Sequence, residues 1–197
     1  MLVSDLIKPK IFQRAHRAQI ELIHDPSSHS HHAFVTDSAV LACFSKEVCS
    51  AAAAIAGVRT RLAPPKTTYT ISVFPTAEPW EWPKPHIDHA LKEDAKLTFP
   101  PPLLVGCLIY LNNVPEHSGG TVVWPGSHRQ LEAVASAHPH EYKYMWMLNR
   151  DITRVSLAAP IELTARAGDV LFYHYLCAHS GSTNNGVEPR FALNHKW

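Results

Sequence analysis

The sequence has no marked excess of charge of either sign and no long apolar run. Its 197 residues include 18 Lys and Arg against 17 Asp and Glu, a formal net charge of +1. The cations are scattered, so the chain lacks a basic stripe of the kind that binds nucleic acid or an anionic membrane. The N-terminal stretch contains Asp5, Lys8, Pro9 and Lys10, which argues against a signal peptide or a membrane span there. We expect a soluble, cytoplasmic protein with neither nucleic acid nor membrane as a partner.

The sequence also lacks closely paired cysteines. Its four cysteines, Cys43, Cys49, Cys107 and Cys177, do not have the short paired spacing of a zinc knuckle. The last three lie in apolar patterns that suit buried free thiols. We therefore expect reduced cysteines, as in the cytoplasm.

Neither a low-complexity linker nor a change in composition divides the chain. A chain of this length can bury a substantial core as one domain. We predict a single domain over 1–197, with a mainly helical part over 1–66 and a strand-rich part over 67–197.

The N-terminal part shows helical spacing and caps. Apolar residues from Ile11 to Leu22 recur on one helical face, and this helix is expected to end near His24. Asp37 or Ser38 can cap a helix that runs to about Phe44. Ser45 can cap another that stops at Gly57. The histidines His29, His31 and His32 are expected in a solvated loop.

From Thr67 the pattern changes to short β-branched and aromatic runs separated by turn residues. The strand candidates are 67–74, 103–111, 121–124, 154–163, 170–175 and 190–196. One helical insert is expected over about 131–149. Short strands with few helices between them favour a mainly β fold with flanking helices, an antiparallel double-stranded β-helix, also called a jelly roll or cupin-like fold.

The most informative motif is His86-Ile87-Asp88, followed by His179 and then by Arg190. On a strand, His86 and Asp88 would share a face while Ile87 points away. Two imidazoles and one carboxylate on one face of an iron ion leave positions open for a co-substrate and oxygen. Arg190 can pair bidentately with a carboxylate of an oxo-acid whose other end chelates the metal. A lone His-x-Asp is weak evidence, so the prediction depends on His179 and Arg190.

Four segments resemble the phytanoyl-CoA dioxygenase-type Fe(II)/2-oxoglutarate enzymes, in the same order along the chain. They are His86-Ile87-Asp88, the stretch 118–128 with its Pro-Gly-Ser-His turn, Ala167-Gly168-Asp169-Val170-Leu171-Phe172, and His179 followed by Asn184 and Arg190. The resemblance implies that His86, Asp88 and His179 ligate the metal. It also implies that Arg190 holds the distal carboxylate of 2-oxoglutarate and that Asn184 shapes the same co-substrate loop. The implied cofactors are Fe(II), 2-oxoglutarate and O2, with ascorbate as a reductant in vitro.

Two positions depart from the family pattern. Some members place a Trp that touches the co-substrate eighteen residues after the first ligand His, and in this chain that count falls near Leu108. Some also place a Ser two residues after the second His, where this chain has Gly181. We therefore expect the co-substrate pocket to differ. Tyr110 and Trp124 are expected either to pack in the core or to line a substrate pocket.

The resemblance implies an oxygenase that hydroxylates a small-molecule metabolite and releases succinate and CO2. Because Asp88 occupies the third ligand position, hydroxylation is favoured over halogenation. Two alternatives remain open. One is a cupin-like metalloenzyme that has no use for 2-oxoglutarate or Arg190, and the other is a non-catalytic jelly-roll binding module. A small polar or amphipathic metabolite is the expected substrate, and the oligomeric state is left unassigned.

Overall fold

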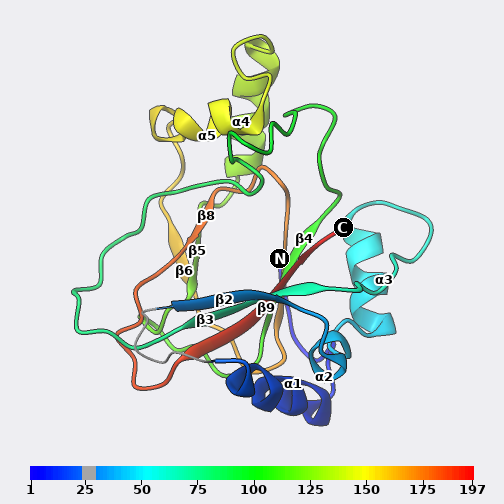
Figure 1. The fold of residues 1–197 in the computed structure, drawn as a ribbon. Coiled ribbons are helices and arrows are strands. Elements are labelled where there is room, and N and C mark those ends of the chain that lie inside the picture. The colour runs from blue at the N-terminus through cyan, green and yellow to red at the C-terminus, as the bar shows by residue number, and fades with distance from the viewer. Residues whose placement is uncertain (24–29) are drawn as a thin grey trace.

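The computed structural model describes residues 1–23 and 30–197, and its strands form two antiparallel sheets (Figure 1). One sheet has six strands in the order β1-β7-β4-β9-β3-β2, and the other has three in the order β6-β5-β8. The strands are β1 (Leu2–Val3), β2 (Ser30–Val35), β3 (Thr68–Val73), β4 (Gly106–Tyr110), β5 (Thr121–Val123), β6 (Ile161–Leu163), β7 (Val170–Tyr173), β8 (His179–Gly181) and β9 (Arg190–Lys196). The predicted fold class, mainly β with flanking helices, is confirmed.

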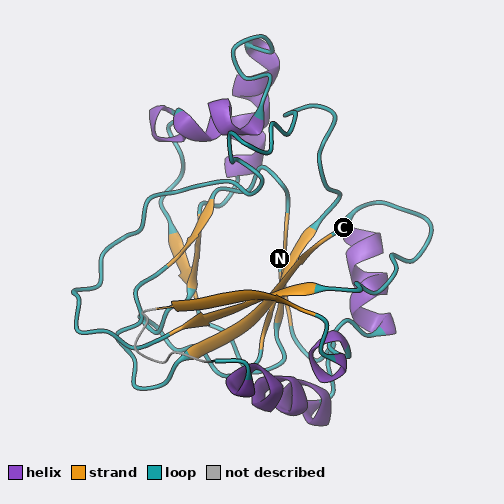
Figure 2. Cartoon of the chain, viewed as in Figure 1, coloured by secondary structure: helices purple, strands orange, loops and turns teal. Residues whose placement is uncertain are grey.

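Three N-terminal helices cover the outer face of the large sheet (Figure 2). They are α1 (Pro9–Glu21), α2 (Ser38–Leu41) and α3 (Lys46–Ile55). Asp37 caps α2 by accepting hydrogen bonds from two backbone N–H groups, and Ser45 caps α3 in the same way through the N–H of Val48. Both predicted helix starts are therefore confirmed.

The strands separate this outer core from an inner face. Successive residues of a strand point to opposite faces, so Cys107 and Ile109 of β4 pack against the helices while Leu108 and Tyr110 point inward. The large sheet thus has one face closed by apolar helices and one face free to build a site.

The prediction of a loop at His31 and His32 is wrong. Residues 30–35 form β2, which pairs with β3 over its whole length. Ala33 and Val35 contact the helical core, whereas the alternate residues face the other way. Histidine is only weakly apolar, so the sequence shows no clear alternation here, and the pairing comes from the neighbouring strand. The predicted helix end near His24 and the position of His29 lie outside the described residues.

Two other strand predictions need correction. Only 161–163 of the segment 154–163 forms a strand, because Ile152–Arg154 is a 3-10 turn and Pro160 has no N–H for a ladder. The segment 170–175 ends as a strand at Tyr173, and His179 begins a separate strand in the small sheet. The turn between them includes a hydrogen bond from the Cys177 N–H to the His174 carbonyl.

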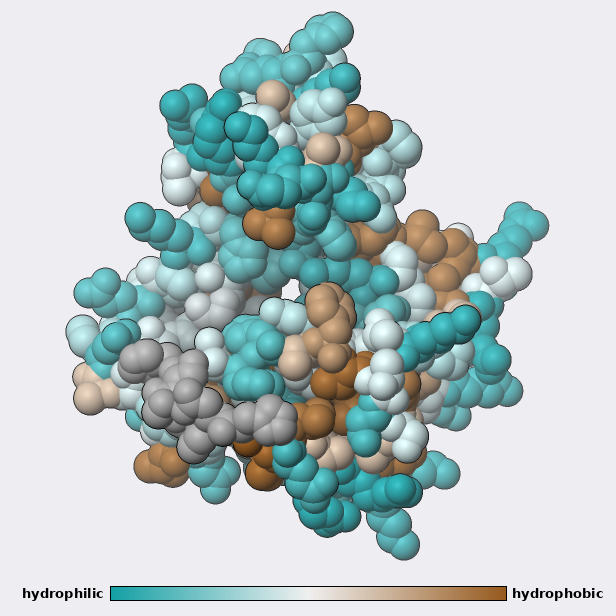
Figure 3. Space-filling model, in the orientation of Figure 1, coloured by the Kyte–Doolittle hydropathy of each residue, from teal (hydrophilic) through white to brown (hydrophobic). Residues whose placement is uncertain are grey.

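The helical insert lies at one end of the molecule, as two helices (Figure 1). These are α4 (Ser127–Ala137) and α5 (Met145–Arg150), separated where His138 leaves helical geometry. Leu131, Met145 and Leu148 form a second core with Ile87. Figure 3 shows that the surface over these helices is largely hydrophilic. Within the described part of the chain, no helix is long and apolar enough to cross a membrane.

Candidate metal centre and active site

The inner face of the large sheet is built from rows of cross-strand neighbours. In β9, Arg190, Ala192, Asn194 and Lys196 alternate with residues that point into the helical core. Lys196 lies opposite Gly106, which in turn lies opposite Tyr173. A cavity of about 400 Å³ lies between this face and the small sheet, and its lining includes His86, Asp88, His179, Arg190, Thr121 and Leu108.

The sequence motif and the later histidine meet through a backbone bridge. The N–H of His86 donates to the carbonyl of His179 at 3.0 Å, and the N–H of His179 donates to the carbonyl of His86 at 2.9 Å. His86 forms only this isolated bridge, and Asp88 lies in a turn, so the two residues do not lie on one regular strand. The shared face is nevertheless present, because His86 and Asp88 point to the same side.

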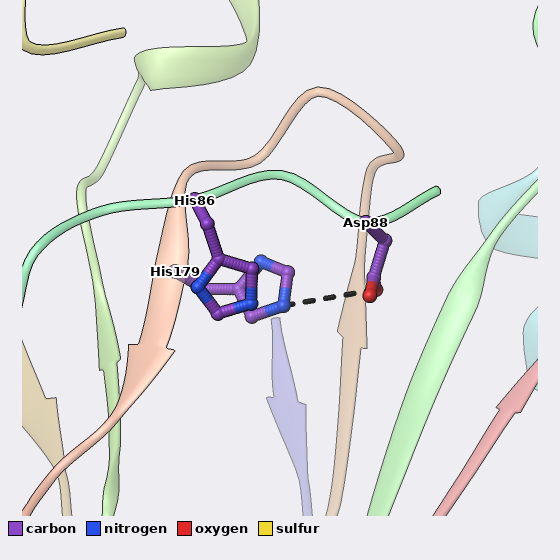
Figure 4. Close-up of side chains that lie close together, drawn as sticks. All are labelled: His86, Asp88 and His179. Carbon is purple, nitrogen blue, oxygen red and sulfur yellow. Dashed lines mark ion pairs between the residues drawn. The ribbon is translucent and has the colours of Figure 1, made fainter. Parts of the chain in front are cut away.

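The three side chains converge on one point (Figure 4). One nitrogen or oxygen from each of His86, Asp88 and His179 lies within 4.8 Å of the other two. His179 Nε2 is 3.6 Å from Asp88 Oδ2, which is the dashed line in Figure 4. Within the described residues this is the only cluster of three or more such side chains that could hold a metal ion. Two imidazoles and a carboxylate at this spacing form the facial triad that suits non-haem iron(II).

The loop that carries His86 and Asp88 packs against the helical insert through Ile87. Ile87 is buried against α4 and α5, and its backbone N–H donates to Asn149 Oδ1 of α5 at 2.9 Å. With Ile87 held on one side, His86 and Asp88 are directed to the other. Sequence analysis did not identify Asn149, because the contact joins residues 62 positions apart.

Asp88 is held through both of its carboxylate oxygens. Tyr173 donates its hydroxyl hydrogen to Oδ2 at 2.8 Å, and the Lys196 ammonium lies 2.8 Å from Oδ1. Asn194 donates in turn to the Tyr173 hydroxyl at 2.9 Å. Burial alone raises the pKa of Asp88, but the interactions with His179 and Lys196 and these hydrogen bonds outweigh it and lower the pKa. Asp88 is therefore an anion at neutral pH and is oriented before any metal binds.

Both imidazoles can present a lone pair to a metal. His179 Nδ1 lies 2.9 Å from the carbonyl oxygen of Cys177, which favours the tautomer with the proton on Nδ1 and leaves Nε2 free. His86 is exposed as a whole residue, but desolvation of its imidazole, followed by the interaction with His179, lowers its pKa to about 4. His86 is therefore neutral at neutral pH, as a metal ligand must be.

Arg190 lies in the same cavity and is 4% exposed. Its Nε donates to the carbonyl of Gly119 at 2.8 Å, while its buried Nη1 has no hydrogen-bond partner within the described structure. Burial lowers the pKa of the guanidinium, although the group remains a cation in proteins. A Cβ at Gly181 would lie 3.7 Å from Nη2, so the glycine leaves that side of the guanidinium uncovered. A buried cation with an unused donor is a site for an anion.

Asn184 does not line this cavity. Its buried side chain donates to the backbone carbonyls of Val73 and Glu188 and accepts from the N–H of Gly186. It thus closes the loop that leads into β9 and Arg190. Tyr110 and Trp124 are core residues, since the Tyr110 hydroxyl is buried and donates to Thr121, and Trp124 packs under the insert.

A second cavity, of about 770 Å³, is also lined by His86 and Asp88. It shares Tyr69, His86, Asp88, Asn194 and Lys196 with the first cavity. Asn194 and Lys196 could have been found from the sequence by counting in twos along β9 from Arg190. Tyr173 and Gly106 could not, because their role depends on the register between strands.

Comparisons with known proteins place this site in a family context. A profile described as phytanoyl-CoA dioxygenase (PhyH) matches residues 8–192. No curated protein matches the chain in sequence.

Solved structures show the same fold at low sequence identity. SnoK, a non-heme alpha-ketoglutarate-dependent carbocyclase from nogalamycin biosynthesis, is 17% identical with a TM-score of 0.67, over 98% of this chain and 77% of SnoK. The epimerase SnoN in complex with Fe3+, alpha ketoglutarate and nogalamycin RO is 16% identical with a TM-score of 0.64, over 98% and 76% of the two chains. EctD from S. alaskensis with 2-oxoglutarate and 5-hydroxyectoine is 15% identical with a TM-score of 0.60, over 98% and 70%.

The family profile spans nearly the whole chain, and the solved structures share its two-sheet fold. The convergent His86, Asp88 and His179 supply the facial triad that such enzymes require. The chain therefore belongs to the phytanoyl-CoA dioxygenase (PhyH) family of non-haem iron, 2-oxoglutarate-dependent dioxygenases.

Proposed function

We propose that this protein is an Fe(II)- and 2-oxoglutarate-dependent oxygenase that hydroxylates a small-molecule metabolite. The observation that carries the proposal is one cavity that contains both the triad and the unpaired Nη1 of buried Arg190. In the overall reaction, substrate, 2-oxoglutarate and O2 give hydroxylated substrate, succinate and CO2. Bound iron(II) and 2-oxoglutarate supply this oxidative chemistry, and the protein supplies binding and orientation.

The donor set fits iron(II). Two neutral imidazoles and a carboxylate form a facial set with open positions, and no thiolate lies among the ligands to favour zinc or copper(I). SnoN was solved with Fe3+ and alpha ketoglutarate, which supports the same pairing here. His86, Asp88 and His179 would hold the metal.

Arg190 would hold the distal carboxylate of 2-oxoglutarate. Its Nη1 is free to donate, and its Nε is already fixed by the Gly119 carbonyl, so the guanidinium has one orientation available. Asn184 would support this role indirectly by fixing the loop before β9. Leu108, Leu171 and Ile71 line the cavity and would exclude water from the bound co-substrate.

The second cavity would admit the substrate that is hydroxylated. It shares His86 and Asp88 with the first cavity but does not include Arg190, so a molecule there would contact the triad without occupying the place of the co-substrate carboxylate beside Arg190. EctD, solved with 2-oxoglutarate and 5-hydroxyectoine, supports a small-molecule substrate of this kind.

Anaerobic binding tests this assignment. Iron(II) chelated by a 2-oxo acid absorbs visible light, so we expect a new absorption band when 2-oxoglutarate is added to the iron-loaded protein under argon. Asp88→Ala should abolish the band by removing a metal ligand. Arg190→Ala should raise the 2-oxoglutarate concentration needed for half-maximal absorption about 10–100-fold, the scale of a charge-assisted hydrogen bond. An Arg190→Ala protein that bound 2-oxoglutarate as tightly as the parent would overturn the assignment of Arg190.

A further inference from the structure

We propose that Lys196 binds a carboxylate of the hydroxylated substrate, which makes the substrate class small monocarboxylates. This inference rests on the proposed function, because it concerns the charge that remains once iron and 2-oxoglutarate are bound. It begins from the position of Lys196, whose side chain is 23% exposed and lines both cavities.

The strand register explains why a cation lies here. Lys196 is on the same face of β9 as Arg190, at the opposite end of the strand, and faces the cavities next to Gly106. Its one ion pair among the described residues is with Asp88, through Oδ1. An ammonium group has three donors, so two remain available even while this contact is kept.

The charges of the assembled site leave Lys196 without a full counter-ion. Iron(II) carries two positive charges, and Asp88 together with the carboxylate of 2-oxoglutarate on the metal carries two negative charges. Arg190 is neutralised by the distal carboxylate. Asp88 then shares its charge with the metal, and Lys196 retains one positive charge in a partly buried position. Partly buried charges are stable when they are paired.

The other ionisable groups of the second cavity do not provide that counter-charge. Asp94 is exposed at the rim and forms no ion pair within the described chain. The side chains of His86, His89 and His195 also line this cavity, and an imidazole carries no negative charge in either protonation state. A bound molecule with one negative charge would supply the missing counter-charge.

One negative charge favours a carboxylate over a phosphate, because a phosphate monoester carries close to two at neutral pH. The cavity of about 770 Å³ has room for a carbon skeleton beside the carboxylate. Since Lys196 contacts a metal ligand directly, the C–H bond presented to the metal lies within a few bonds of the carboxylate. Exposed Phe34 and Leu91 at the mouth suit an apolar tail.

Paramagnetic relaxation of simple probes tests this inference. The full-length protein is loaded with manganese(II) and saturating 2-oxoglutarate under argon, and the relaxation of hexanoate protons is compared with that of hexanamide, its uncharged match. We expect hexanoate to bind about tenfold or more tightly than the amide, the scale of a charge-assisted hydrogen bond. Lys196→Met should abolish this preference, and Lys196→Arg should retain it.

One control variant and one internal signal make the result decisive. Lys84→Met removes an exposed lysine outside both cavities and should not weaken hexanoate binding. The relaxation of 2-oxoglutarate itself is read in the same samples. If 2-oxoglutarate is not relaxed, the proposed function fails. If it is relaxed but hexanoate and hexanamide behave alike, or Lys196→Met keeps the preference, the substrate inference alone is overturned.

Discussion

Gly106 decides where the ring of Tyr173 lies, and through it how Asp88 is held. A Cβ at Gly106 would overlap the aromatic ring of Tyr173, its cross-strand neighbour. Without that atom, the ring lies across β4 and its hydroxyl reaches Asp88 at 2.8 Å. One missing side chain on an inner strand thus contributes to the geometry of a metal ligand on a distant loop.

Gly106→Ala should therefore displace Tyr173 and loosen Asp88. We expect a loss of about 1–3 kcal/mol in the free energy of unfolding from overpacking. Metal affinity should fall about 10–100-fold, as for other changes to groups that orient metal ligands. Denaturant unfolding and cobalt(II) titration measure the two effects.

Tyr173→Phe is the matched variant, because it keeps the ring and removes only the hydroxyl. It should weaken cobalt(II) binding in the same direction without the overpacking cost. If Tyr173→Phe bound cobalt(II) as tightly as the parent, Tyr173 would have no part in orienting Asp88.

The sequence singled out the candidate site residues better than the residues that position them. His86, Asp88, His179 and Arg190 stand out because their types and spacing have a chemical meaning. The positions of Tyr173 and Gly106 gain a chemical meaning only when the register of β4 and β7 is known. Register depends on contacts between residues distant in sequence, so it could not be derived from local patterns.

At the scale of elements, helix α5 acts as a support for the ligand loop. Asn149 accepts the Ile87 N–H at 2.9 Å, while Ile87 fills the core beneath the insert. Asn149→Ala should leave this N–H without its partner and reduce the free energy of unfolding by about 1 kcal/mol. Cobalt(II) affinity should also fall, since His86 and Asp88 flank the freed group. Unfolding and metal titration are measured on the same preparations.

Asn149→Asp keeps an acceptor oxygen at this position, because a carboxylate oxygen replaces the amide oxygen. This variant serves as the control. Its stability and cobalt(II) affinity should lie closer to the parent than those of Asn149→Ala. Equal losses in both variants would show that the acceptor oxygen is not what holds the loop.

Elements with strong local signals were predicted well, and elements defined by their neighbours were not. The caps Asp37 and Ser45 located two helix starts. Strand β2 was missed because its residues show little apolar alternation and its structure comes from pairing with β3. The turn after Tyr173 was missed because apolar residues continue through it, although the chain passes there from one sheet to the other.

At the scale of the whole molecule, the half-buried side chain of His195 makes stability depend on pH. His195 contacts the rings of Phe44 and Trp197, and burial, followed by the charge of Lys196, lowers its pKa from 6.5 to about 4. Above pH 6.5 the imidazole is neutral in both states. Between pH 6.5 and about 4, His195 binds a proton in the unfolded chain but not in the folded chain. The free energy of unfolding therefore falls as pH falls.

His195→Gln removes this contribution. We expect the melting temperature of the parent to decline more between pH 7.5 and pH 5.5 than that of the variant, as measured by thermal unfolding of the metal-free proteins. An equal or steeper decline in the variant would contradict the account of a buried neutral His195.

Succinate formation is the most direct test of the central claim, that the triad and Arg190 form one oxygenase site. Purified protein is incubated in air with iron(II), ascorbate and 2-oxoglutarate, and succinate is quantified for the parent, His179→Ala and Arg190→Ala. We predict slow succinate formation in the parent that falls at least about tenfold in both variants. Succinate formed equally by the parent and both variants would contradict the assignment of the site, and iron-loaded parent protein that formed none, with or without hexanoate, would contradict the proposed reaction.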